Sequence, residues 1–338
     1  MRIAIDAMGG DYAPDEIIAG AVEAAPLLDK DDVLILIGPK DLVASKLSEK
    51  NTHNYKCIEV INAETVIGMD EKPVEAIRSK RNNSIDVMAK MGASGEVDAV
   101  ISAGNTGACV AAFQMRMRNL PGVTRPGISV VFPTFEGPLT LCDVGANISC
   151  KPIHLYQYAV MASLYSRHNF GIEKPRIGIM SIGEEDAKGN ETIKKARELL
   201  RSDKNMNFVG NVEGRDIFSG KCDVIVTDGY VGNVVLKLSE ALVSYMFKSI
   251  KKELIENHKI MAIPVGHVMK KIYKKYDYHE YGGAPLLGIN GTALICHGSS
   301  KARTIRSAIL AAKKYHKEHI NEHIIEYLSK SDVRSADE

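Results

Sequence analysis

The sequence lacks an excess of charge of either sign, because its 338 residues include 43 lysines and arginines against 42 aspartates and glutamates. A near-neutral chain gives no general reason to bind nucleic acid. The sequence also lacks an apolar run approaching the ~20 residues of a membrane-spanning helix. Its start, Met1 to Gly10, turns acidic too soon for a secretory signal and is typical of a first core strand. We therefore expect a cytoplasmic protein without a nucleic-acid partner.

The sequence has few of the residues that mark nucleophilic or metal chemistry. Its six cysteines include no C-x-x-C pair, and most lie in apolar segments of β character, so we expect buried, reduced thiols. No G-x-S-x-G elbow is present. Cys150 could accept an acyl group, but nothing in its sequence surroundings would lower the pKa of its thiol, and a structural role is favoured. The acids at 184–186 suggest a divalent metal, but no second carboxylate group completes a site, so we expect neither a metal nor a cofactor.

What the sequence does contain is a repeated layout. Val97–Gly107 and Cys222–Gly232 each read as a short buried strand that leads into a glycine turn. An apolar-periodic helix follows each, over about 108–118 and about 234–245. Backbone N–H groups at such a helix start converge on one point and bind anions, phosphate above all. Neither copy has the lysine of a Walker loop or the spacing of a dinucleotide fingerprint. Plain strand-to-helix connections are the alternative, but the repetition favours an anion site in at least one copy.

Short apolar strands alternate with helical patterns along most of the chain, which favours a mixed or parallel sheet covered on both faces. Strands are expected at Ile3–Asp6, Val33–Gly38, Cys57–Ile61, Asp98–Ser102, Ile128–Phe132, Leu139–Asp143, Arg176–Ser181, Phe208–Val212, Asp223–Thr227 and Thr292–His297. Small or polar residues follow several of them. Because ligands bind beyond the carboxyl ends of strands in open α/β sheets, we expect these loops to share one crevice.

Residues 242–276 break this rhythm. Leu242, Met246, Ile250 and Leu254 repeat every fourth residue and form one apolar stripe on a helix. A turn at 260–265 and a lysine-rich second arm should follow, which predicts a projecting helical hairpin over about 240–278. Its apolar tip is typical of a core hairpin or subunit interface, and also of attachment to a membrane surface, through Ile260, Met261, Ile263 and Val265. The polar residues 330–338 predict a frayed tail.

Lys188 lies in an acidic loop, Gly183–Asn190, directly after a predicted strand. A solvated turn is one interpretation. The other makes Lys188 a point charge for phosphate, oriented by Glu184 or Glu185.

Two further polar groups have similar alternatives. The segment His297-Gly-Ser-Ser300 ends a strand and opens a helix, so Ser299 or Ser300 is more readily an N-cap than a nucleophile. Basic residues cluster at 78–81 and 115–118. They form either a solvated helix face or a surface for an acidic or phosphorylated partner, because clustered arginines bind carboxylates and phosphates bidentately.

Over about residues 1–320, the chain resembles the bacterial phosphate acyltransferase (PlsX) family. The resemblance rests on segments that occur in the same order, namely Asp6-Ala-Met-Gly-Gly-Asp11, Ser102-Ala-Gly-Asn-Thr-Gly-Ala108, Asp143-Val-Gly-Ala-Asn147, Ile182-Gly-Glu-Glu-Asp-Ala-Lys-Gly-Asn190, Gly210-Asn-Val-Glu-Gly-Arg215, Asp228-Gly-Tyr-Val-Gly-Asn233, Tyr281-Gly-Gly-Ala-Pro-Leu-Leu-Gly288 and His297-Gly-Ser-Ser300. Ser149 and Lys301 depart from the family pattern, which has acidic residues there, so no role is assigned to them.

The resemblance implies transfer of a fatty acyl group from acyl carrier protein to inorganic phosphate, which makes an acyl phosphate for phospholipid synthesis. It implies a homodimeric three-layer α/β/α fold with a mixed, mostly parallel sheet, related to isocitrate and isopropylmalate dehydrogenases and to phosphotransacetylase. Residues 1–329 would form one catalytic unit, in one or two lobes. It also implies peripheral association with the inner face of the cell membrane, beside a downstream glycerol-3-phosphate acyltransferase.

This chemistry needs little acid–base machinery, since phosphate is a dianion near neutral pH and a thiol of pKa about 8.5 leaves readily. We therefore expect direct attack by phosphate, with Lys188 offsetting charge and Asn233 orienting the oxyanion or phosphate. Phosphate or substrate contacts are assigned to Gly104, Asn105, Thr106, Gly107, Asn147, Gly229, Gly232, His297, Ser299 and Ser300. The acidic carrier protein is expected to contact Arg78, Lys80, Arg81, Arg116 and Arg118.

Two other functions stay open at this point. A metal- and NAD-dependent dehydrogenase of the related fold would need an aspartate cluster and an adenosine-binding loop, neither of which is legible. A non-catalytic lipid or carrier-protein adaptor has support only from the apolar tip and the basic clusters.

Overall fold

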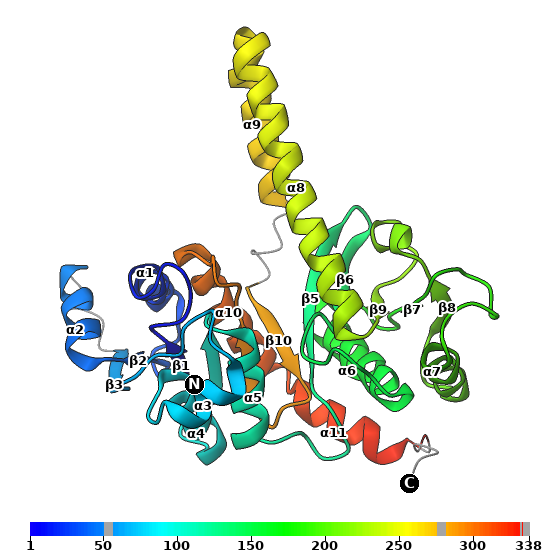
Figure 1. Ribbon diagram of the computed structural model, residues 1–338, viewed down its shortest axis with the longest axis horizontal. Helices are drawn as coiled ribbons and strands as arrows, with labels where there is room; N and C mark the ends of the chain where they lie inside the picture. Colours follow the sequence, from blue (N-terminus) through cyan, green and yellow to red (C-terminus); the bar gives the residue numbers. More distant parts are fainter. Residues whose placement is uncertain (51–56, 276–281, 332, 334–338) are drawn as a thin grey trace.

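The computed structural model describes residues 1–50, 57–275, 282–331 and 333, and only the backbone of residues 259–262 and 273–275. One eleven-stranded sheet organises these residues, in the order β3-β2-β1-β4-β11-β10-β5-β6-β9-β7-β8 (Figure 1). The strands are β1 (Arg2–Asp6), β2 (Val33–Gly38), β3 (Ile58–Asn62), β4 (Ala99–Ser102), β5 (Gly127–Thr134), β6 (Gly137–Cys142), β7 (Ile177–Met180), β8 (Phe208–Val212), β9 (Val224–Val226), β10 (Ala284–Leu287) and β11 (Thr292–Ile295).

Neighbouring strands are parallel except at the centre of the sheet. There β10 runs antiparallel to both β11 and β5, and β5 runs antiparallel to β6. The sheet therefore has two parallel halves, one from β3 to β11 and one from β6 to β8, and the strands of one half run opposite to those of the other. Each step between strands adds a twist of roughly 20–25°, so the four steps from β11 to β9 turn the halves by about 80–100°. This twist lets the carboxyl ends of both halves face the cleft between them.

Helices cover both faces of the sheet, in the three layers expected. They are α1 (Asp15–Ala24), α2 (Lys40–Glu49), α3 (Pro73–Ser79), α4 (Ser84–Ser94), α5 (Thr106–Arg116), α6 (Pro152–Phe170), α7 (Glu191–Ser202), α8 (Gly229–Asn257), α9 (Lys259–Lys275), α10 (Ala302–Lys317) and α11 (Ile320–Lys330). Alternate residues of β1 face different helices. Ile3 and Ile5 pack with α1 and α10, whereas Ala4 packs with α4 and α5. The core layer on the Ala4 side continues beneath both halves of the sheet.

All ten predicted strands are present, within two residues at each end. The strand that the sequence did not predict is β10. It lies between glycines and contains Pro285, which normally argues against a central strand because proline cannot donate to the ladder. β10 is nevertheless the strand that joins the two halves.

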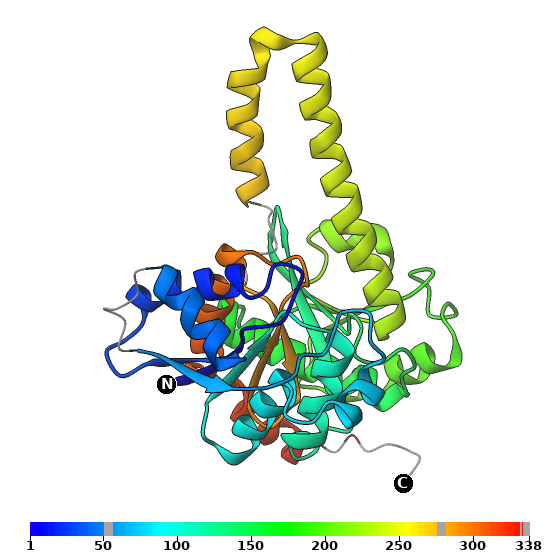
Figure 2. The ribbon, with the colours of Figure 1, turned by 60° about the vertical axis from the view of Figure 1, so that its left-hand side comes forward.

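Helices α8 and α9 form the predicted hairpin, which projects from the sheet domain (Figures 1 and 2). Two expected boundaries were wrong. α8 begins at Gly229 rather than near residue 234, and it continues to Asn257. The chain reverses at His258, so the expected turn at 260–265 is instead the start of α9, with Pro264 inside the helix.

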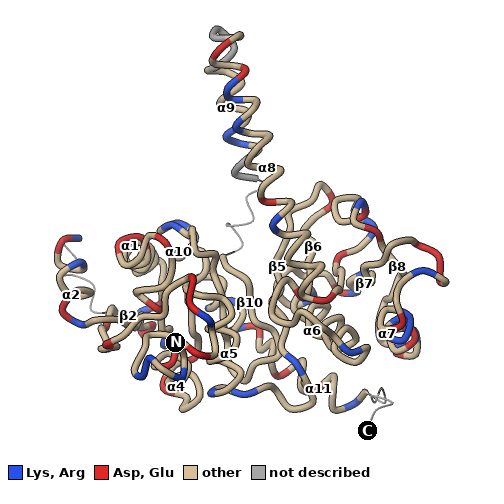
Figure 3. Tube along the Cα trace, viewed as in Figure 1, with Lys and Arg blue, Asp and Glu red and all other residues tan. Residues whose placement is uncertain are grey.

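The side chains of Ile260 and Met261 lie outside the described residues, as does most of the expected tail at 330–338. Ile263 is 76% exposed and Val265 is half-buried. Lysines lie along both arms of the hairpin (Figure 3). None of the described helices combines the length and the apolarity needed to span a bilayer.

Candidate functional site

The first glycine turn, which joins β4 to α5, packs against the buried carboxyl group of Asp6. Ser102 Oγ donates to Asp6 Oδ2 over 2.7 Å and accepts from the Gly104 N–H over 3.0 Å. Burial raises the pKa of Asp6. A β-carbon on Gly9 would lie 2.6 Å from both Asp6 Oδ2 and the Gly104 nitrogen, so the turn approaches the end of β1 closely. The glycines here allow this approach as well as a turn.

Asn105 fixes this turn through every polar atom of its amide. Its Oδ1 accepts from the Ala108 N–H over 3.1 Å and caps α5. Its Nδ2 donates to the carbonyl oxygens of Gly68, Met69 and Glu71 over 2.9–3.3 Å. The amide therefore shapes the turn and is already satisfied without a substrate.

The second glycine turn is the first turn of α8, and it packs on the loop 143–147. A β-carbon on Gly229 would lie 2.8 Å from Asp143 Oδ2. The Asp143 carboxyl group is buried and accepts from the N–H groups of Ile128, Gly145, Ala146 and Asn147 over 2.7–3.1 Å. Burial raises the pKa of Asp143, and these donors oppose it. A protein carboxyl group thus occupies the nest of N–H donors at this loop.

The side-chain amide of Asn147, like that of Asn105, makes its hydrogen bonds within the protein. Its Nδ2 donates to the Pro126 carbonyl oxygen and to the Tyr158 hydroxyl, over 2.7 and 2.8 Å. Its own carbonyl oxygen accepts from the Gly229 N–H over 2.8 Å. Asn147 therefore ties the loop to the start of α8.

A cavity of about 110 Å³ lies in the cleft between the two halves of the sheet. Thr106 from the first turn, Asn233 from the second and His297 after β11 all line it, so these loops share the crevice that the sequence predicted. The cavity is otherwise mainly apolar, lined by Ile128, Val130, Val131, Val144, Leu236, Ala284, Ile295 and Cys296. It combines an apolar slot with a few polar groups.

Two charged residues that the sequence reading missed, Lys237 and Glu240, also line this cavity. They follow Asn233 at i+4 and i+7, so one face of α8 presents all three. Lys237 Nζ lies 2.6 Å from His297 Nε2 and 3.0 Å from Glu240 Oε2. The helical spacing of Lys237 and Glu240 from Asn233 was the sequence signal that could have identified them.

The residues after His297 do not act as the expected N-cap. The N-cap of α10 is Lys301, and Glu16 Oε2 accepts from the Ala302 N–H over 2.7 Å in place of a serine. Ser299 instead lies beside the imidazole, with its Oγ 2.7 Å from His297 Nδ1. The Ser300 hydroxyl is buried and has no hydrogen-bond partner among the described residues.

The acidic loop after β7 leaves Lys188 exposed. Glu184 accepts from Lys221 over 3.0 Å, so it does not orient Lys188 as expected. Asp186 holds the loop to α7 through a bidentate pair with Arg201, over 2.6 and 2.9 Å. Within the described part of the chain, the Lys188 ammonium has no hydrogen-bond or ion-pair partner. Lys188 does not line the cleft cavity.

The basic residues on and near α3 and α5 are not equally available. Arg116 donates to Asp86 over 2.8 Å, and Lys80 pairs with Glu71. Ion-pair partners for the exposed side chains of Arg78, Arg81 and Arg118 are absent from the described structure. These three arginines are the accessible part of the cluster.

The thiols near the cleft are poor nucleophiles. Burial raises the pKa of the Cys150 thiol to about 11 and that of Cys296 to about 12. Cys150 also donates weakly to the Asn147 carbonyl oxygen, over 3.7 Å. Cys150 is half-buried, and its raised pKa agrees with the structural role favoured for it. Nowhere in the described residues do three or more His, Cys, Asp or Glu side chains form a metal-binding group.

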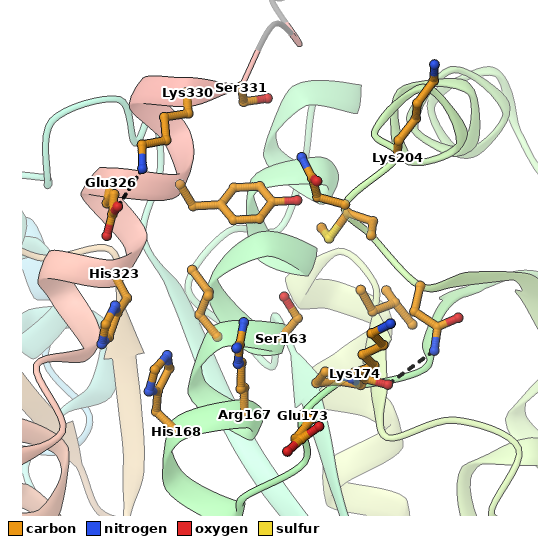
Figure 4. Close-up of a pocket in the computed structure, with 17 residues that line it drawn as sticks. Ser163, Arg167, His168, Glu173, Lys174, Lys204, His323, Glu326, Lys330 and Ser331 are labelled. Atoms are coloured by element: carbon orange, nitrogen blue, oxygen red, sulfur yellow. Dashed lines mark hydrogen bonds and ion pairs between the residues drawn. The ribbon is translucent and has the colours of Figure 1, made fainter.

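A larger cavity, of about 840 Å³, lies between the end of α6, the segments before β7 and β8, and α11 (Figure 4). Arg167, Lys174 and Lys204 line it, and the His168 and His323 rings stack at 3.9 Å. Burial lowers the pKa of His168, with His323 and Arg167 adding to the effect. Neither glycine turn lines this cavity, so it is separate from the cleft.

Comparisons with known proteins agree with this geometry. The family model described as "Fatty acid synthesis protein" matches residues 1–323. A protein named phosphate acyltransferase from Nitratidesulfovibrio vulgaris is 44% identical over 96% of this chain and 94% of its own length. Another with that name, from Heliobacterium modesticaldum, is 45% identical over 93% of each chain.

Solved structures show the same fold at low sequence identity. A phosphotransacetylase from Streptococcus pyogenes matches with a TM-score of 0.63 and 17% identity, over 94% of each chain. The EutD phosphotransacetylase from Staphylococcus aureus has a TM-score of 0.58 and 16% identity, over 93% of this chain and 94% of its own. The fold relation to phosphotransacetylase is therefore confirmed, and by sequence the chain belongs to the fatty acid synthesis protein family.

Proposed function

We propose that the protein transfers a fatty acyl group from acyl carrier protein to inorganic phosphate and so forms an acyl phosphate for phospholipid synthesis. The observation that supports this most directly is the cleft cavity, where an apolar slot meets the starts of α5 and α8. The apolar lining suits the first carbons of an acyl chain, by the hydrophobic effect. The polar lining suits phosphate, because the N-terminus of α5 and a lysine favour a dianion. The relatives named phosphate acyltransferase support the same reaction.

The reaction is direct attack. A phosphate oxygen bonds to the thioester carbonyl carbon, the C–S bond breaks, and the proton of the hydrogen phosphate passes to the departing sulfur. The products are an acyl phosphate dianion and a free carrier thiol. The high pKa of Cys296, the thiol that lines the cavity, argues against an acyl-enzyme.

Lys188 and Asn233 are the residues to which we assign the chemistry. Lys188 offsets the charge of phosphate and of the transition state, and its lack of a partner among the described residues supports that role. Asn233 orients the phosphate or the oxyanion from the first turn of α8 that faces the cavity. Thr106, His297 and Ser299 supply further contacts. Gly104, Gly107, Gly229 and Gly232 shape the backbone around them, and Ser300 lies next to this wall.

The carrier protein docks, in this proposal, on the accessible arginines Arg78, Arg81 and Arg118. Acyl carrier protein is acidic, and exposed guanidinium groups bind carboxylates bidentately. The intramolecular pairs of Lys80 and Arg116 reduce their contribution.

The hairpin serves dimerisation and membrane contact. In the α8 stripe, Leu242, Met246 and Ile250 are 54%, 52% and 42% exposed, and Leu254 is half-buried. An apolar stripe of this length calls for a partner, and a second copy of the chain is the partner we propose. The exposed Ile263 and the lysines around it favour peripheral contact with the inner face of the membrane, beside a glycerol-3-phosphate acyltransferase. In this division, residues 1–329 are one catalytic unit into which 240–278 is inserted.

The test is incubation of the protein with acyl carrier protein bearing a fatty acyl chain and with labelled phosphate. We expect labelled acyl phosphate and free carrier thiol in equal amounts. Absence of both would refute the proposal, and release of thiol without label in acyl phosphate would indicate hydrolysis instead. Liposome flotation of an Ile263→Asp variant tests the membrane contact separately.

A further inference from the structure

Lys237 and His297 meet across the cleft from opposite halves of the sheet. Lys237 lies on α8, which follows β9, whereas His297 follows β11. Their Nζ and Nε2 atoms are 2.6 Å apart although 60 residues separate them in the chain. Both line the cavity, and Lys237 is the only lysine or arginine among the described residues that do so. A cation therefore lies on the wall of the slot, with 46% of its side chain exposed.

The contacts of Lys237 leave one of its protons for a ligand. An ammonium group has three N–H donors and no acceptor. One N–H meets His297 Nε2 and a second meets Glu240 Oε2 over 3.0 Å. Only 18% of the Glu240 side chain is exposed, so its carboxylate holds the Lys237 ammonium in a defined position. No described residue accepts from the third N–H, which can donate to an anion in the cavity.

His297 lies between Lys237 and Ser299. Lys237 Nζ faces Nε2 of the ring over 2.6 Å. On the other side of the ring, Ser299 Oγ lies 2.7 Å from Nδ1, and the Ser299 N–H lies 3.2 Å from the same nitrogen. One imidazole thus brings together polar groups from both halves of the sheet.

We propose that Lys237 is a second phosphate-binding cation of the site, positioned by His297 and Glu240. This inference rests on the proposed function. The position one helical turn beyond Asn233 supports it, because a phosphate held by Asn233 at the start of α8 lies beside the next residue on that face. Lys188, on the loop after β7, does not line the cavity, whereas Lys237 does.

The alternative is that the pair only latches the two halves of the sheet together. A latch would change stability when removed, without a selective effect on phosphate. The two roles therefore separate in the kinetic constants for the two substrates and in the melting temperature.

The experiment measures initial rates against phosphate and against acyl carrier protein for Lys237→Ala, Lys237→Arg and His297→Gln. We expect Lys237→Ala to lower kcat/KM for phosphate by about 100-fold or more, as loss of one preorganised donor does. Its KM for the acyl carrier protein should stay within about twofold. Lys237→Arg should recover part of this loss. The kcat/KM of His297→Gln for phosphate should lie between those of the wild type and Lys237→Ala.

Lys194→Ala is the matched control, because Lys194 and Glu191 form a helix ion pair with the same three-residue spacing, on α7. It should leave both constants unchanged. Equal losses for both substrates in Lys237→Ala, with a lowered melting temperature, would establish the latch and overturn the proposal.

Calorimetric titration with inorganic phosphate gives a readout that does not depend on turnover. We expect the wild type to bind phosphate and Lys237→Ala to bind at least tenfold more weakly. Equal binding by the two proteins, or none by either, would overturn the inference. If the wild type binds phosphate through Lys237 but forms no acyl phosphate, the proposed reaction fails while the cation site stands.

Discussion

Gly232 packs so closely on Asp143 that a β-carbon at position 232 would lie 1.9 Å from the Asp143 carbonyl oxygen. Gly232→Ala should therefore push α8 away from the loop 143–147 and destabilise the protein by roughly 1–3 kcal/mol, as overpacking does. Thermal unfolding measures the loss. Gly266→Ala on α9 is the control, because no atom lies within 4 Å of its β-carbon position. There alanine should be neutral or stabilising by about 0.5–1 kcal/mol, and an equal loss in both variants would contradict the packing argument.

Lys188→Ala should lower kcat by about 100-fold or more, because a cation aimed at transition-state charge is lost. The melting temperature should not change, since the Lys188 side chain is exposed and makes no ion pair with a described residue. Lys195→Ala, an exposed lysine on the adjacent α7, serves as control. Near-normal turnover of Lys188→Ala would remove Lys188 from the mechanism.

Cys296→Ala should retain most of the activity. With a pKa of about 12, only about one Cys296 thiol in 10⁵ is ionised at pH 7, so it is not a competent acyl acceptor. Intact-mass spectrometry during turnover should show no acylated protein. An acyl adduct on the wild type that disappears in Cys296→Ala would establish a covalent intermediate and refute direct attack.

Arg81→Glu should raise KM for acyl carrier protein and leave KM for phosphate unchanged, because the exposed guanidinium has no ion pair to another described residue. The wild-type KM for the carrier should rise steeply with salt, since exposed charges are screened within about 10 Å at 0.1 M. Arg116→Gln should have a smaller effect on this KM, as Arg116 is bound to Asp86. Salt-independent carrier binding would count against this docking surface.

Asp32 gives a prediction for acid stability. Burial by itself would raise the pKa of Asp32, but hydrogen bonds from Lys313 and from the Met1 ammonium outweigh it and hold the pKa at about 2. A depressed pKa means that the stabilisation is complete above the unfolded-state value of about 4 and is lost as the pH falls towards 2. Asp32→Asn should therefore destabilise the protein at pH 7 by roughly 1–3 kcal/mol.

The difference between Asp32→Asn and the wild type should narrow between about pH 4 and pH 2. Urea unfolding at several pH values measures it. Asp31→Asn, at the exposed neighbouring position, should show no such trend. A difference that stays constant with pH would mean that the carboxylate pairs are not its source.

The sequence predicted the layered fold well, because its strands are short apolar runs bounded by glycine and polar residues. The start of α8 was misplaced because Gly229 and Gly232 read as a turn. In the structure they are helical, and their missing side chains allow α8 to contact Asp143. β10 was not predicted because the proline in it is typical of an edge strand rather than a central strand. Long-range packing, which no local pattern encodes, decided both.

The site was predicted less well than the fold. Thr106, Asn233 and His297 meet in one cavity, as expected of loops at strand ends. Asn105 and Asn147 looked equally suited to bind phosphate, yet their amides are used within the protein. A capping amide and a ligand-binding amide look alike in a sequence. Lys237 was missed because a lysine after the first turns of a helix is usually solvated.

α8 has no glycine or proline between Asn233 and its end at Asn257, so none of the usual causes of a kink is present. Its 29 residues make a rod about 44 Å long, anchored at one end in the cleft and free of the sheet at the other. A tilt imposed at the hairpin by a bilayer or a second subunit would be carried to Asn233 and Lys237. Docking at a surface would then change the alignment of the residues that line the cleft.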